Sequence, residues 1–233
     1  MPTSMTRRGW DRYLPLSGAA FTALMVAGAA AFPMPPGGDV SPAAKPAWLA
    51  AHYNAVIAQS YVRALAGVAF IALGVAVATA IRHAAPGTSL PAGCALIGGT
   101  FSGALLLSSQ AVSIAAALFV HGGGNEDTTR ALGALQDAFL NLSSLPAILL
   151  FGAVGAVSLR TRLLSRWLTV VTLLGVPFAL VDSASYEGGP FETVGFIGLV
   201  YFLAWELIVG VQLFKTQRTM PDDVDSPEPA FAV

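Results

Sequence analysis

Two carboxylates fall inside long apolar stretches of the sequence, where ionisable residues are unusual. Asp137 lies about two helical turns inside the apolar segment 131–158, and Glu206 lies near the middle of the segment 194–214. A charged side chain at the centre of a bilayer costs roughly 2.5–3.5 kcal/mol on insertion scales, so such residues often mark ligand or ion sites. Both acids are therefore candidate functional residues.

Asp137 is the first member of a polar helix face. Asp137, Asn141 and Ser144 are spaced i, i+4 and i+7, which places them on one side of a helix. The preceding apolar segment carries polar residues at comparable depth, namely Ser109, Gln110 and Ser113. We expect these two groups to line a small polar cavity that opens to the outer side of a membrane.

The charge of Asp137 needs a partner, and the sequence offers Arg63 or Arg130 near the same level. The alternative interpretation of this polar group is a hydrogen-bond network that only holds helices together. Such pairs are worth only about 0.6 kcal/mol each in membrane proteins. A functional polar group predicts an open pocket for a ligand or ion, whereas a purely structural network predicts a solid bundle.

Glu206 has no basic partner in its own segment. We expect a neutral carboxyl group there, or a hydrogen bond to a serine or threonine of a neighbouring helix; a role in proton relay is the alternative. Pro146 lies one turn beyond the Asp137 face. Because proline lacks a backbone donor, we expect it to kink the helix that contains it.

The remaining reactive residues argue against most catalytic chemistry. His52 and His121 are expected outside the membrane and His83 inside it, and Cys94 is the only cysteine. No metalloprotease, phosphate-binding, nucleophile-elbow or dinucleotide motif is present. We therefore predict no catalytic residue, metal or cofactor, and keep one open alternative, an outer metal site built from His52, His121 and nearby acids (Glu126, Asp127 and Glu187).

The composition identifies the class of protein. Of the 233 residues, 55% are hydrophobic and 11% are charged, and the mean hydropathy is +0.68. Soluble domains have about 25% charged residues, so this chain is expected to be an integral membrane protein with membrane lipids around it. A net charge of -1 makes nucleic acid an unexpected partner.

Apolar runs of about 20 residues match the hydrocarbon core of a bilayer and must be helical there. The sequence predicts an all-α bundle, 14–214, with six such spans at about 14–34, 61–81, 93–119, 131–158, 166–183 and 194–214. The first run resembles a signal peptide but is longer than a typical one, so we expect it to remain as a helix.

Three segments flank or interrupt these spans. Residues 1–13 are expected to be a cytoplasmic N-terminal segment, and 215–233 a disordered cytoplasmic tail rich in acids and prolines. The segment 46–60 has an apolar stripe. It is predicted to be an outer helix that either lies at the membrane interface or extends the second span outward.

The distribution of lysine and arginine predicts the orientation. With both termini inside, the outer side carries Lys45, Arg63 and Arg130, and the other nine of the twelve cations are cytoplasmic: Arg7, Arg8, Arg12, Arg82, Arg160, Arg162, Arg166, Lys215 and Arg218. The opposite orientation would invert this ratio. We expect the inner or plasma membrane as the location.

Small residues are frequent in the spans. Gly99 and Gly103 form a small-xxx-small pair, with Gly98 beside them, and this spacing lets helices approach closely. The pair predicts packing within the bundle. The alternative is a homo-oligomer formed through this face.

The second half of the sequence carries several recognisable motifs: ALQDAF (134–139), Leu145-Pro146, LLSRWL (163–168) and GPFETVGFIGLVYFLAW (189–205). With these, the chain resembles a family of small six-span bacterial membrane proteins, common in actinobacteria and catalogued as a domain of unknown function. The resemblance covers about 14–214. Positions on the pattern are Asp137, Pro146, Arg166, Trp167, Gly189, Pro190 and Trp205, whereas Glu206 departs from it. The resemblance implies a fold but no activity.

Three hypotheses for function remain at this point. The first is a non-enzymatic membrane protein that binds or transports a small or lipidic ligand in a pocket near Asp137. The second is a structural or regulatory membrane subunit without a ligand. The third is an intramembrane enzyme, which the absence of a nucleophile–base pair disfavours.

Overall fold

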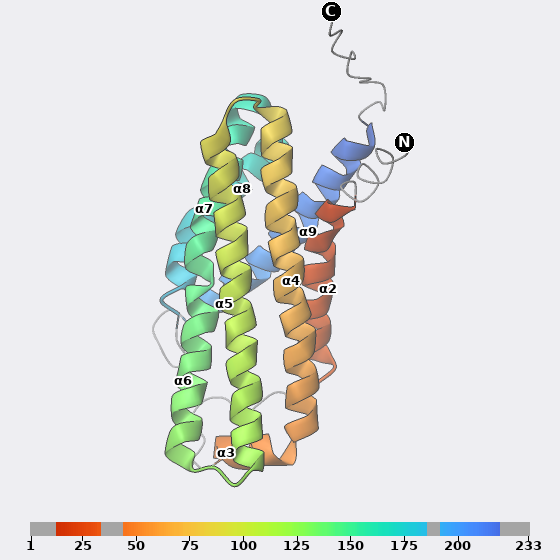
Figure 1. Cartoon of the computed structure of the whole chain (residues 1–233). Coiled ribbons are helices and arrows are strands. Elements are labelled where there is room, and N and C mark those ends of the chain that lie inside the picture. The colour runs from red at the N-terminus through yellow and green to blue at the C-terminus, as the bar shows by residue number, and fades with distance from the viewer. Residues whose placement is uncertain (1–12, 34–43, 186–191, 220–233) are drawn as a thin grey trace, which may run out of the picture.

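The computed structural model describes residues 13–33, 44–185 and 192–219. These residues form a helical bundle, and none of them belongs to a β-strand (Figure 1). The elements in chain order are η1 (Leu14–Leu16), α2 (Ser17–Ala30), α3 (Ala44–Ala51), α4 (Tyr53–Ala84), α5 (Ser89–His121), α6 (Glu126–Leu142), α7 (Ser144–Thr161), α8 (Arg166–Asp182) and α9 (Glu192–Thr219).

Four helical stretches are long and apolar enough to cross a membrane. They are Tyr53–Ala84, Ser89–His121, Glu126–Thr161 and Thr193–Thr216. The apolar helix Leu14–Ala30 is shorter, and α8 has 17 residues. The all-α prediction is confirmed for the described residues, which include four helical stretches with the length and composition needed to cross a membrane; the count of six spans stays a prediction.

The α4–α5 pair is held together by glycines. A Cβ atom added to Gly99 would lie 2.6 Å from the Cα of Gly74, and one added to Gly103 would lie 2.7 Å from the carbonyl oxygen of Gly67. Gly98 lies on the other side of α5, where its Cβ would meet the carbonyl oxygen of Pro146 at 2.7 Å. The small-residue motif is therefore used inside the chain, and an oligomer formed through Gly99 and Gly103 would have to displace α4.

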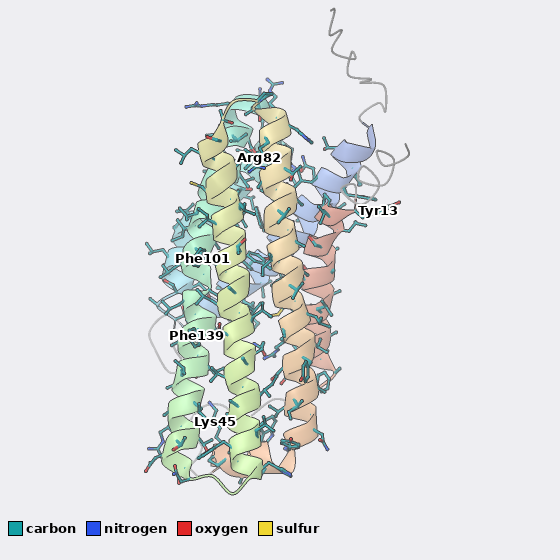
Figure 2. All side chains as sticks on the ribbon, viewed as in Figure 1. Tyr13, Lys45, Arg82, Phe101 and Phe139 are labelled. Atoms are coloured by element: carbon teal, nitrogen blue, oxygen red, sulfur yellow. The ribbon has the colours of Figure 1, made fainter. Side chains whose placement is uncertain are left out.

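The outer segment 46–60 is divided between two helices. α3 ends at Ala51, His52 interrupts the helix, and α4 begins at Tyr53 and continues without a break to Ala84. α3 lies across one end of the bundle, where Lys45 is found, and Arg82 lies at the opposite end (Figures 1 and 2). One part of the segment therefore turns sideways as α3, and the other part continues into the second predicted span as α4; a position of α3 at the membrane interface stays a prediction.

The predicted fourth span, 131–158, is not one uninterrupted helix. α6 starts at Glu126, where the Asn125 side chain accepts a hydrogen bond from the Thr128 amide at 2.8 Å. The helix is interrupted at Ser143 and resumes as α7. Pro146 explains the break, because it cannot donate to the carbonyl group four residues earlier and its ring clashes with that group.

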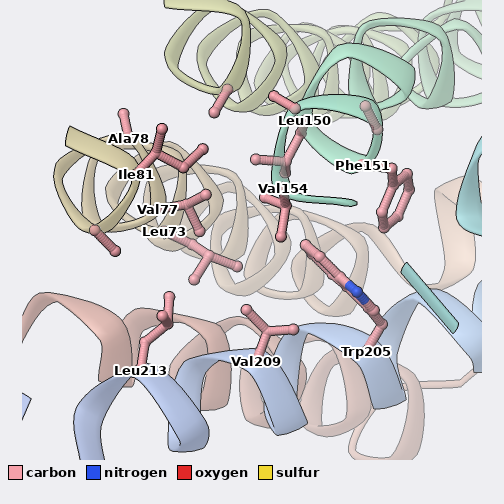
Figure 3. Close-up of a cluster of buried hydrophobic side chains, with 14 of the residues drawn as sticks. Leu73, Val77, Ala78, Ile81, Leu150, Phe151, Val154, Trp205, Val209 and Leu213 are labelled. Atoms are coloured by element: carbon pink, nitrogen blue, oxygen red, sulfur yellow. The ribbon is translucent and has the colours of Figure 1, made fainter. Parts of the chain in front are cut away.

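α9 crosses the bundle obliquely (Figure 1) and closes the core. Its Trp205 packs edge-on against Phe151 of α7, with ring centroids 4.6 Å apart (Figure 3). The indole N–H of Trp205 donates a hydrogen bond to the Thr172 hydroxyl of α8 at 2.8 Å. Tyr201 donates to the Val171 carbonyl at 2.5 Å. The helix continues through Thr219, so the first five residues of the predicted tail are helical, while 1–12 and 220–233 lie outside the described residues.

Candidate functional site

A cavity of about 390 Å³ lies between the helices at the level of the α6–α7 break. A volume of this size is at the lower end of the roughly 300–1,000 Å³ typical of small-molecule sites. Its polar lining comprises Arg63, Ser102, Gln110, Asn141, Ser143, Ser144, Asp182 and Ser185. Its apolar lining comprises Phe21, Met25, Phe70, Leu106, Leu140, Gly195, Phe196, Leu199 and Phe202.

The cavity has an Arg63 end and an aromatic end. Arg63 lies two helical turns from Phe70 along α4, which is about 10 Å at 1.5 Å per residue. The Arg63 end is the one nearer to α3, and Gln110 and Asn141 lie toward that end on α5 and α6. Ser102 lies at the level of Phe70, because its neighbour Gly103 packs against the carbonyl oxygen of Gly67. The cavity therefore offers polar groups at both ends, and apolar surface at the aromatic end.

Three aromatic rings from different helices form a wall at the aromatic end of the cavity. Phe21 of α2 lies 5.4 Å from Phe70 of α4, and Phe70 lies 5.5 Å from Phe202 of α9, between ring centroids. Phe202 in turn packs edge-on against Phe151 at 5.7 Å, which joins this end of the cavity to the main core. These contacts give the cavity a well-packed wall.

Several polar groups of the lining have no partner within the described chain. The Arg63 Nε and the Ser102 Oγ are buried without a hydrogen bond, and Ser102 is only 4% exposed. The amides of Gln110 and Asn141 form none of the hydrogen bonds found among the described residues. Buried polar groups are normally satisfied, so these groups favour a cavity that holds water or a ligand.

Asp182 is the acid that the structure brings to this cavity. Its carboxylate accepts a hydrogen bond from the Ser144 hydroxyl of α7. Gly195 and Gly198 of α9 lie against it, so that a Cβ atom on either residue would be 3.5 Å from Oδ1. Asp182 is the last residue of α8; the glycine pair at i, i+3 is the signal in the sequence that could have indicated a close neighbour.

Four of the seven predicted pocket residues line the cavity, namely Arg63, Gln110, Asn141 and Ser144. Ser113 instead accepts a hydrogen bond from Ser60 at 3.1 Å, which joins α5 to α4, and Ser109 is fully buried outside the lining. Asp137 also lies outside the lining. It precedes Asn141 by one turn of α6, and the helix break prevents the face from continuing regularly past Ser143.

Arg63 and Arg130 were the expected charge partners of Asp137. Arg130 forms an ion pair with Glu126 at 2.7 Å on the exposed side of α6. Arg63 lines the cavity, and Gly28 of α2 packs near its side chain, where a Cβ atom would lie 3.2 Å from Cγ. The described part of the chain shows no ion pair between Asp137 and either arginine.

Glu206 is fully buried, as its position in the sequence predicted. Neither carboxylate oxygen has a hydrogen-bond partner among the described residues, so the expected bond to a serine or threonine is absent there. Its backbone carbonyl packs directly against Gly18 of α2. Glu206 does not line the cavity and is a separate buried acid.

The outer histidines take part in aromatic stacking. His52 stacks on Trp48 at 4.7 Å, and His121 stacks on Tyr53 at 4.2 Å, between ring centroids. No cluster of three histidine, cysteine or acidic side chains suitable for a metal occurs in 13–33, 44–185 or 192–219. Glu187, one of the acids considered for an outer metal site, lies outside the described residues.

Comparisons with family models, with curated proteins and with solved structures found no match to this chain.

Proposed function

We propose that this chain is a six-span plasma-membrane protein that binds, or passes across the membrane, a small or lipidic ligand in the cavity between α4, α5, α8 and α9. The observation that carries the proposal is the lining. Within the described part of the chain, it combines an arginine nitrogen and a serine hydroxyl that have no hydrogen-bond partner with an aromatic wall in one 390 Å³ space. A ligand-free structural subunit, the alternative, has no need for such a cavity.

The proposed orientation has both termini in the cytoplasm and the Arg63 end of the cavity facing outward. The lysine and arginine bias supports it. Arg82 lies at one end of the bundle and Lys45 at the other (Figure 2), as this orientation requires. α4, with 32 residues, is about 48 Å long. The hydrocarbon core is about 30 Å thick, so the α3 end of the bundle would project beyond it.

Native mass spectrometry of the detergent-purified protein tests ligand binding. Ser102→Leu places an apolar side chain in the cavity, and Ala104→Leu makes a matched change on the exposed face of the same helix. We expect a co-purified small molecule or lipid on the wild type and on Ala104→Leu, and its loss from Ser102→Leu. Equal occupancy in all three proteins would contradict the proposed site.

Thiol labelling of intact cells tests the orientation. In a Cys94→Ala background, Asp127→Cys lies after the α5–α6 turn and Thr88→Cys lies in the α4–α5 turn, and both positions are exposed. A membrane-impermeant reagent should label Asp127→Cys on whole cells and Thr88→Cys only after permeabilisation. The reverse pattern would invert the topology.

Membership of the actinobacterial six-span family is also part of the proposal. It is supported by the quoted motifs and by the position of Pro146 and Trp205 at structurally important points, the α6–α7 break and the α8–α9 contact. A homo-oligomer remains a prediction; the Gly99–Gly103 face is covered by α4, so another face would have to form it.

A further inference from the structure

One cation and one anion border the cavity from helices that do not pack on each other. Arg63 belongs to α4, which packs mainly on α5 and α2, whereas Asp182 belongs to α8, which packs on α7 and α9. Both residues line the cavity. The cavity therefore separates a positive wall from a negative wall.

The two charges do not neutralise each other directly. No ion pair joins Arg63 to Asp182 within the described chain. Among the described residues, the Arg63 Nε has no partner, and the hydroxyl of Ser144 is the one donor to the Asp182 carboxylate. Both side chains are partly buried, and a partly desolvated charge is stabilised by an opposite charge with good hydrogen bonds, so a ligand carrying both signs would stabilise both walls.

The apolar part of the lining specifies the rest of the ligand. Phe21, Phe70 and Phe202 lie about two helical turns from Arg63, at the other end of the cavity. A volume of 390 Å³ is small for a molecule with two acyl chains. The space fits one apolar chain attached to a compact polar head.

We propose that the cavity binds a single-chain amphiphile with a zwitterionic head group, its anionic part on Arg63, its ammonium on Asp182 and its chain against the wall that Phe70 and Phe202 form. The guanidinium group is suited to a phosphate or carboxylate, and the free amides of Gln110 and Asn141 can hydrogen-bond the same head. This inference rests on the proposed function, because it names the class of ligand for that site.

The test is a titration of the purified protein in a neutral maltoside detergent, read out by native mass spectrometry. The probes share a lauroyl or dodecyl chain: lauroyl lysophosphatidylethanolamine carries both charges, lauroyl lysophosphatidate only the anion, dodecylamine only the cation, and monolaurin neither. Free phosphoethanolamine supplies the head without the chain. We expect the zwitterionic lipid to bind at least about tenfold more tightly than every other probe.

Two variants assign the charges. Arg63→Gln should lower the affinity for the zwitterionic lipid to that for dodecylamine. Asp182→Asn should lower it to that for lysophosphatidate. Arg130→Gln, which removes an exposed cation, should leave the affinity for the zwitterionic lipid unchanged. If either cavity variant fails to fold, the comparison of probes on the wild type still decides the question.

The outcomes separate this inference from the proposed function. Equal binding of the zwitterionic and singly charged probes would overturn the zwitterion assignment, and equal binding of free phosphoethanolamine would overturn the amphiphile assignment; either leaves a ligand-binding cavity in place. If Ser102→Leu weakens none of the probes relative to Ala104→Leu, the cavity is not the binding site and the proposed function fails as well.

Discussion

The hydrogen bond between Trp205 and Thr172 fastens α9 to α8 and can be removed with little change of shape. Thr172→Val replaces the hydroxyl by a methyl group of similar size. It leaves the indole N–H, on a side chain only 1% exposed, without the acceptor that now lies 2.8 Å away. A buried donor left unsatisfied costs about 1–3 kcal/mol.

The membrane reduces this figure, because polar groups of separated helices also find partners there; measured values average about 0.6 kcal/mol and reach about 1.7 kcal/mol. The Thr172 hydroxyl already bonds the Leu168 carbonyl of its own helix at 2.7 Å and keeps that bond when α9 leaves. The Trp205 N–H has no such local partner. We therefore expect Thr172→Val to cost about 1–1.7 kcal/mol, near the upper measured value.

The assay is reversible unfolding in bicelles or mixed micelles, with Trp205→Phe and the double variant completing a double-mutant cycle. Thr161→Val is the control, since that hydroxyl bonds only the Val157 carbonyl of its own helix. Trp205→Phe should abolish the effect of Thr172→Val. Additive single effects, or a loss for Thr172→Val no larger than for the control, would refute the reasoning.

Two further predictions concern helix packing and helix ends. Gly99→Val should destabilise the protein by about 1–3 kcal/mol, because its Cβ would lie 2.6 Å from the Gly74 Cα. The control in the same unfolding assay is Gly152→Val, because nothing lies within 4 Å of a Cβ atom at Gly152. Asn125→Ala should remove the cap of α6 and cost about 0.5–2 kcal/mol, seen as faster hydrogen exchange in the first turn of α6 while α7 is unchanged.

The helices could be predicted closely from the sequence, because lipid requires continuous apolar helices and the apolar runs are sharply bounded. The run 166–183 corresponds to α8, Arg166–Asp182, almost residue for residue. The break at Ser143 was only partly predictable. Pro146 predicted a kink. It did not predict that Asp137 would lie outside the cavity that Asn141 and Ser144 line.

The candidate site was predicted less well, since it depends on how helices rotate about their axes and on which neighbours they meet. Arg63 and Gln110 line the cavity, at a depth that can be counted along a predicted span. Asp182 could not be assigned to the cavity from depth alone: its role depends on Ser144 of α7 and on the glycine face of α9, contacts between segments distant in sequence.

An experimental density map of the protein in native-lipid nanodiscs would show whether the cavity holds an amphipathic ligand. We expect elongated density inside the cavity, with one end beside Arg63 and the other against Phe70 and Phe202. A cavity that is closed by side chains, or that contains only isolated water-sized peaks, would contradict it.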